Sequence, residues 1–274
     1  MTRLMKFAVT FFAVILVASG SMVYAQTAPS SPGQDVPQPT DKSRFSSEDK
    51  WQFSVTPYAW MISMDTKATV RNYSVTSNIY FSDTIKDVDF AGQIHFEAQK
   101  GKWGFFFDPT YLKITHDGTL SNGSDVRLQI EQWLVELGGF YQLGKWSLEG
   151  KGKRSVTVDA LGGGRYWYMS SNIDTGSIYN PSKTTQWIDP FIGVRLAADI
   201  TENLVFNIRG DIGGFGVGSD FSWNALGAFG YRFAKDITGY LGYRALYVDY
   251  KAGSSNIRYE ATAHGPIIGL SFAF

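Results

Sequence analysis

The chain has 274 residues, of which 44% are hydrophobic and 16% aromatic, and its 25 basic and 25 acidic residues cancel to a formal net charge of zero. This balance does not favour a nucleic-acid partner or long-range steering by charges of one sign. No cysteine occurs, so the sequence excludes disulfides, thiolate metal sites and lipidated cysteines.

The first 25 residues have the pattern of a secretory signal peptide. Arg3 and Lys6 precede the apolar run from Phe7 to Ala18, which is too short to span a bilayer, and Val23-Tyr24-Ala25 is a small-residue cleavage site. We expect the mature chain to begin at Gln26. The alternative is an uncleaved anchor helix.

The next segment, residues 26–50, carries Pro29, Pro32, Pro37 and Pro39 among polar residues, with few apolar side chains to bury. This composition predicts a disordered periplasmic leader. The remainder, residues 51–274, is a succession of segments with alternating polarity and forms one predicted domain.

That alternation predicts an all-β fold, a transmembrane antiparallel up-and-down β-barrel of about ten strands, with twelve or eight as alternatives. The expected strands are Trp51 to Ile62, Phe90 to Lys100, Trp103 to Ile114, Asp125 to Leu143, Val156 to Met169, Gln186 to Asp199, Leu204 to Gly216, Ser222 to Phe233, Thr238 to Tyr250 and Ile257 to Phe274.

Connection lengths orient the barrel. The turns at Lys100 to Lys102, Thr201 to Asn203 and Lys235 to Ile237 are short, as periplasmic turns are, so we expect both termini in the periplasm. The longer segments Ser63 to Asp89 and Ser170 to Thr185 are then extracellular. The first of these alternates weakly and predicts an extended hairpin, which raises the count to twelve if it enters the membrane.

Strand parity assigns the two faces of each strand. In the eighth expected strand, Phe229 and Tyr231 face lipid, whereas Asn224 and Arg232 face the lumen. The same reasoning predicts a lumen that contains charges of both signs. Its members are Glu97, Asp108, Asp159, Arg165, Asp189, Arg195, Arg209, Asp211, Arg232 and Arg244. Among these, we expect Arg195, Arg209, Asp189 and Asp211 to form one network.

Some charged residues have the wrong parity for a polar lumen. Glu131 and Glu136 fall on opposite faces of one strand, as do Arg244 and Asp249, so we expect one bulge in each strand. Gly265-Pro266 is a further expected bulge. The shift there turns inward four residues, namely Arg258, Glu260, Thr262 and His264.

The last strand ends on an aromatic residue. Phe274, Phe272, Leu270 and Ile268 recur at every second position, which resembles the terminal strand of outer-membrane barrels, where it serves as the assembly signal. We therefore expect Phe274 to be that signal, in the outer membrane of a Gram-negative bacterium. The expected partners are outer-membrane lipid, lipopolysaccharide and the barrel-assembly machinery, while the oligomeric state stays open.

Several motifs together resemble a family of small, functionally uncharacterised proteobacterial outer-membrane β-barrel proteins of the OmpA-like barrel class. The resemblance covers nearly all of residues 51–274 and implies a barrel, but no activity or site residues. The motifs are Pro57-Tyr58-Ala59-Trp60, Gly101-Lys102-Trp103-Gly104, Asp189 to Arg195, Gly210 to Asp220 and Gly242 to Tyr250.

The sequence contains no motif that clearly indicates catalysis or cofactor binding. The Gly-rich run from Gly210 to Gly218 lacks the Lys-Ser/Thr ending of a phosphate-binding loop, and we interpret its glycines as relief of crowding or a tight bend. His116-Asp117 fits a solvated turn better than a catalytic dyad. No ligand spacing implies a metal or an organic cofactor.

These observations favour a non-enzymatic barrel that is structural or forms a narrow pore with a mixed-charge lumen. The alternative is a surface adhesin or receptor that uses the long extracellular loops. An outer-membrane hydrolase is the less favoured third hypothesis.

Overall fold

The computed structural model describes residues 50–70, 73–119, 125–147, 154–174, 182–251 and 257–274. The expected signal peptide and the leader up to residue 49 lie outside the described residues. The described part is all-β apart from two short helical turns, α2 (Phe81–Thr84) and η1 (Ile85–Asp87). No helix within these ranges is long and apolar enough to cross a membrane.

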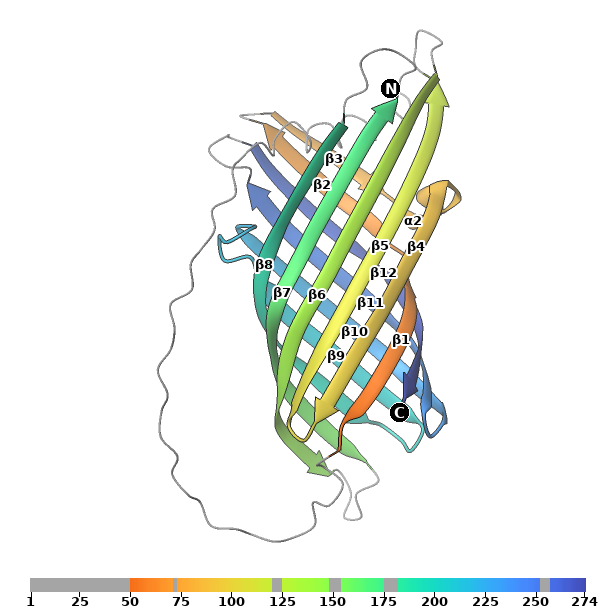
Figure 1. Ribbon diagram of the computed structural model, residues 1–274, viewed down its shortest axis with the longest axis vertical. Helices are drawn as coiled ribbons and strands as arrows, with labels where there is room; N and C mark the ends of the chain where they lie inside the picture. Colours follow the sequence, from red (N-terminus) through yellow and green to blue (C-terminus); the bar gives the residue numbers. More distant parts are fainter. Residues whose placement is uncertain (1–49, 71–72, 120–124, 148–153, 175–181, 252–256) are drawn as a thin grey trace.

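Twelve strands form one antiparallel sheet, and ten of them close into a barrel (Figure 1). The ten barrel strands are β1 (Gln52–Trp60), β4 (Val88–Lys100), β5 (Trp103–Thr119), β6 (Asp125–Ser147), β7 (Ser155–Asp174), β8 (Ser182–Asp199), β9 (Leu204–Gly213), β10 (Phe221–Ala234), β11 (Ile237–Lys251) and β12 (Ile257–Ala273). Each pairs with its neighbours in chain order, and β1 pairs with β12 to close the ring. The prediction of an antiparallel barrel of about ten strands is confirmed.

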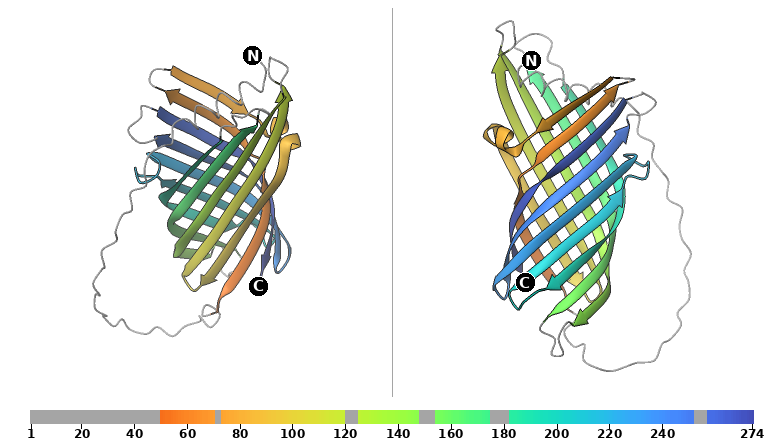
Figure 2. Two further views of the ribbon diagram at one scale, coloured as in Figure 1. Left: turned by 45° about the horizontal axis from the view of Figure 1, so that its top comes forward. Right: turned by 180° about the vertical axis from the view of Figure 1, so that it is seen from behind.

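The other two strands, β2 (Ser63–Val70) and β3 (Tyr73–Ile79), form the hairpin expected between Ser63 and Asp89. The hairpin extends the sheet from the upper part of β12 and does not enter the ring. It lies at the opposite end of the barrel from the C-terminus (Figure 2). Both ends of the described chain meet at one rim, since Phe53 and Phe274 exchange two backbone hydrogen bonds.

Regular alternation of side chains gives the barrel an apolar exterior. Outward residues at mid-strand are large, hydrophobic and exposed, for example Phe229 at 56% and Leu241 at 63%. Such residues occur around the ring, and further examples are Phe105, Phe107, Leu137, Ile188, Ile192, Val194, Ile208, Ile212 and Ile268. A continuous exposed apolar belt of this kind is typical of a surface that contacts lipid.

The expected bulges in three strands are absent. β11 and β12 pair in unbroken register from Ile237 with Phe272 to Lys251 with Arg258. In β6 the register with β7 shifts between Gln142 and Gly144, far from Glu131. Asp249 and Glu131 therefore face outward. The predicted inward turn of Arg258, Glu260, Thr262 and His264 is likewise wrong, since these four residues lie on the outer wall.

Gly265 and Pro266 have a different role from the expected bulge. They lie where the partner of β12 changes from β1 to β2, and the backbone N–H of Met61 donates to the Pro266 carbonyl across this seam. A Cβ on Gly265 would lie 1.9 Å from the Met61 carbonyl oxygen. The pair therefore permits close approach of the kinked β1–β2 segment without shifting the register of β12.

Candidate functional site

The inward faces of the strands carry an ion network at mid-height of the lumen. Its centre is Glu136 on β6, whose carboxylate lies 2.8 Å from Arg165 Nε, Arg209 Nη2 and Arg244 Nη2. Arg244 stands on β11, across the ring from β6, so the network spans the lumen. Glu136 reaches this position without the bulge that sequence reasoning required.

A second carboxylate completes the centre. Asp211 accepts hydrogen bonds from Arg165 Nη2 at 2.7 Å and from Arg209 Nε at 2.9 Å. Asn224, which the sequence placed inward without a role, donates to Asp211 at 2.9 Å and accepts from Arg244 at 3.0 Å. We call Glu136, Arg165, Arg209, Asp211, Asn224 and Arg244 the central network.

The central network makes further contacts with the Tyr58 hydroxyl and with the rings of Phe191 and Trp60. Tyr58 donates to Asp108 at 2.6 Å and accepts from Arg244 at 3.4 Å, which links Asp108 to the centre. The Arg165 guanidinium lies 5.0 Å from the Phe191 ring centroid, and Arg244 lies 4.9 Å from Trp60. Cation–π contacts of this kind stabilise a guanidinium, and they do so more strongly when the guanidinium has been removed from water.

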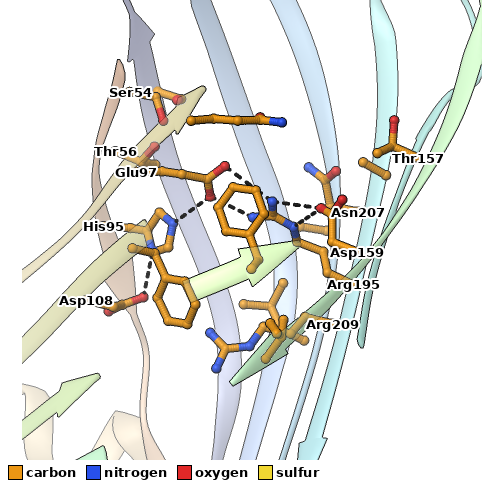
Figure 3. A pocket seen from close by; sticks show the side chains of 18 of the residues that line it. Ser54, Thr56, His95, Glu97, Asp108, Thr157, Asp159, Arg195, Asn207 and Arg209 are labelled. Atoms are coloured by element: carbon orange, nitrogen blue, oxygen red, sulfur yellow. Dashed lines mark hydrogen bonds and ion pairs between the residues drawn. The ribbon is translucent and has the colours of Figure 1, made fainter. Parts of the chain in front are cut away.

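A second layer of charges, in which Figure 3 labels Glu97, Asp159 and Arg195, lies nearer the rim that carries the chain ends. Arg195 on β8 donates to Glu97 on β4 at 2.6 Å and to Asp159 on β7 at 2.9 Å. His95 lies 3.0 Å from Asp108 and 3.4 Å from Glu97. We call the row formed by Glu97, Asp159 and Arg195, all three from the predicted set, the lower bar. It crosses the lumen from β4 to β8.

Asp189 is not part of a four-membered network with Arg195, Arg209 and Asp211. Its fully buried carboxylate instead accepts hydrogen bonds from the indole N–H groups of Trp167 and Trp187 and from both the N–H and the hydroxyl of Ser219.

These bonds hold the β9–β10 loop against β8. At the start of this loop Gly214, Phe215 and Gly216 have positive φ values of 88°, 51° and 75°. The glycine-rich run therefore forms a tight bend, as interpreted from the sequence. A Cβ on Gly218 would lie 2.7 Å from Asp189 Oδ1, so the loop also needs close backbone approach at that point.

The remaining predicted member, Arg232, lies at the rim. It is paired with Asp199 at 2.5 Å, and its side chain is 37% exposed. The structure thus divides the predicted set among the central network, the lower bar, Asp108 between these two, the Asp189 contact and this rim pair. Strand parity identified the inward charges, but it carried no signal for the grouping across the lumen.

On the side of the central network away from the chain ends, the lumen is filled with apolar side chains. The next inward residues along β6, β7 and β11 are Leu134, Trp167 and Leu246, all buried. They pack in one cluster with Trp60, Trp187, Val248 and Tyr259. Stacking of Trp187 on Tyr250, with ring centroids 4.5 Å apart, joins β8 to β11 within this layer.

On the other side of the central network lies a cavity of about 580 Å³. Its wall includes Arg209 and Arg244 at the inner end and Lys50, Lys102 and Lys145 near the rim that carries the chain ends. The cavity therefore reaches that rim and ends at the central network. Charged side chains of the lower bar also line it (Figure 3).

The histidines do not form the dyad considered from the sequence. His116 Nδ1 lies 2.7 Å from Asp87, while Asp117 pairs with Arg127 on the neighbouring strand. His264 lies on the outer wall between Tyr243 and Asp65. Within the described ranges, no cluster of three or more His, Asp or Glu residues could hold a metal ion.

Comparison with known proteins finds similarity only among solved structures. No protein family matches the chain, and no curated protein matches it. The outer membrane protease OmpT from Escherichia coli is 11% identical, with a TM-score of 0.48, and the match covers 84% of this chain and 99% of OmpT.

Two further barrels are more distant. Ail, the attachment invasion locus protein of Yersinia pestis, is 8% identical with a TM-score of 0.35, over 82% of this chain and 98% of Ail. Neisserial surface protein A is 13% identical with a TM-score of 0.30, over 81% and 97%. None of these likenesses indicates what this chain binds or does, and the family resemblance stated from the motifs stays a prediction.

Proposed function

We propose that the chain is a non-enzymatic outer-membrane barrel of a Gram-negative bacterium, with both termini in the periplasm and a lumen that is closed at mid-height. The membrane placement is supported by the apolar exterior of a closed ring whose interior is charged. The periplasmic position of the termini is supported by the short turns at the same rim, at Lys100 to Trp103 and Ala234 to Ile237.

The observation that carries the proposal is the burial of Glu136 among three arginines from β7, β9 and β11. The side chains of Glu136, Arg165 and Arg244 are at most 2% exposed. An ion or solute that crossed this level would have to displace paired charges, and the apolar layer behind them offers it no polar groups. The predicted mixed-charge lumen is therefore a plug rather than the lining of a pore.

Cysteine labelling tests the closed lumen, because the natural chain contains no cysteine. Gln132→Cys lies on the extracellular side of Glu136 along β6, and Thr157→Cys lines the cavity on the other side. A membrane-impermeant maleimide added to intact cells is expected to react at Gln132→Cys and not at Thr157→Cys. Permeabilising the outer membrane is expected to expose Thr157→Cys. Labelling of Thr157→Cys in intact cells would show that the reagent passes the network.

A second candidate function, surface recognition, is favoured by the β2–β3 hairpin. In the described part of the chain β3 pairs with β2 alone, so its other edge offers free backbone groups. Residues Tyr73–Ile79 include no charged side chain, and Tyr73 is 82% exposed. Uncharged free edges are suited to adding a partner strand. Deleting residues 74–81 and measuring whole-cell adherence tests this role, and unchanged adherence of a correctly assembled variant argues against it.

A further inference from the structure

We propose that the cavity between the central network and the periplasmic rim is a binding site for a small, neutral solute rich in hydroxyl groups. This inference rests on the proposed closed lumen, because a cavity that ends at the network holds a solute instead of passing it. The volume of about 580 Å³ falls within the range of small-molecule sites, about 300–1,000 Å³.

One carboxylate oxygen in the cavity wall has no partner among the described residues. Asp159 lines the cavity and is only 4% exposed. Its Oδ2 accepts from Arg195 Nε at 2.9 Å, whereas its buried Oδ1 has no hydrogen-bond partner in the described part of the chain. A carboxylate oxygen can only accept, so it requires a donor, and leaving it without one is costly. Oδ1 is itself inaccessible to solvent, so a ligand hydroxyl supplies that donor only when the Asp159 side chain turns towards the cavity.

The other charges of the wall already have partners. Glu97 pairs with Arg195, Asp108 with His95, and Arg209 with Asp211. An ionic solute would have to break one of these pairs to gain its own counter-charge. The inner part of the cavity therefore favours a neutral solute, although the exposed lysines at the rim attract anions towards its mouth.

Uncharged polar groups complete the lining. Six such side chains from β1, β6, β7 and β12 surround the cavity and make no side-chain hydrogen bond within the described residues. They are Gln52, Ser54, Thr56, Gln142, Thr157 and Ser271. Amides and hydroxyls both donate and accept, as the hydroxyls of a sugar do. Phe106, Phe140 and Leu161 add apolar surface for the C–H groups of such a solute.

Titration calorimetry on the full-length protein in detergent micelles tests this assignment with three probes. Sucrose represents a neutral hydroxyl-rich solute, glucose 6-phosphate its anionic counterpart, and putrescine a diamine. We expect saturable heat with sucrose. We expect Thr157→Trp, which fills the cavity, to abolish that heat, while Val158→Trp on the outer face of the same strand leaves it unchanged.

Ser271→Trp fills the cavity from β12 and replaces Thr157→Trp if that variant does not fold. Absence of saturable heat with sucrose would overturn the assignment, as would tighter binding of putrescine or of glucose 6-phosphate. Binding that survives both cavity-filling variants would place the solute elsewhere. Failure of the closed lumen itself would instead appear as ion conductance, which this titration does not measure.

Discussion

Replacing Glu136 by glutamine preserves side-chain shape and removes one charge from the central network. The carboxylate lies 2.8 Å from Arg165, Arg209 and Arg244, and the site is fully buried. Asp211 keeps its own contacts with Arg165 and Arg209, which limits the loss. Removing one partner of a buried pair costs about 3–5 kcal/mol. We expect Glu136→Gln to lower the free energy of unfolding by about that amount, measured by urea titration in phospholipid vesicles with tryptophan fluorescence.

Two further variants make this result specific. Glu131→Gln changes an outward carboxylate on the same strand, which interacts with Tyr111, and should cost less than about 1 kcal/mol. Adding Arg209→Met to Glu136→Gln removes one cation from the excess positive charge that the loss of Glu136 leaves, so the double variant should lose less stability than the sum of the single variants. A cost for Glu136→Gln no larger than that of the control, or strict additivity, would refute the pairing.

Three other changes test other parts of the structure. Phe229→Asp, on the lipid-facing wall, should destabilise the folded barrel in bilayers by about 2–4 kcal/mol, whereas Asn207→Asp in the cavity wall should cost far less in the same urea titration. Deleting Phe274 removes two backbone hydrogen bonds to β1 and the terminal aromatic, and should reduce outer-membrane assembly measured by heat-modifiable migration; full assembly would reject that role. Gly218→Ala should speed proteolysis of the β9–β10 loop, because the added Cβ would clash with the Ile188 carbonyl oxygen and with Asp189. Gly227→Ala, which has open space around it, should not change the rate, and equal rates for the two variants would contradict the packing described.

The alternation of side chains predicted the fold well because the barrel obeys a single rule along each strand. In β10, Asn224 faces the lumen and Phe229 faces outward, as parity requires. The rule holds wherever a strand lies between lipid and a polar interior. Strand number, strand direction and the inward charges of β7 to β9 followed from it.

The same rule failed for outward charges because the strands are longer than the membrane is thick. β6 has 23 residues, which at about 3.3 Å per residue greatly exceeds the apolar band of about 25 Å. Asp249 lies near the end of β11, where its outward carboxylate pairs with Arg258, and the outward Glu131 interacts with Tyr111. The bulges expected from the sequence depend on the premise that every strand carboxylate faces the lumen, and the strands have no bulge at those positions.

Groupings across the lumen could not be read from the sequence. Glu97 and Arg195 are 98 residues apart, and Glu136 and Arg244 are 108 apart. Strand tilt and the stagger between strands decide which inward residues come into contact. Neither quantity can be inferred from the alternation of side chains within one strand. Asp189 shows the same limit, because its partner Ser219 lies in a loop whose path depends on positive-φ residues.

The most direct measurement of the closed lumen is the single-channel conductance of the purified protein in a planar bilayer. The central network and the apolar layer behind it predict that the natural protein inserts without conductance steps. Regular, reproducible steps from the natural protein would contradict the plug and would mean that the inward charges line an open channel.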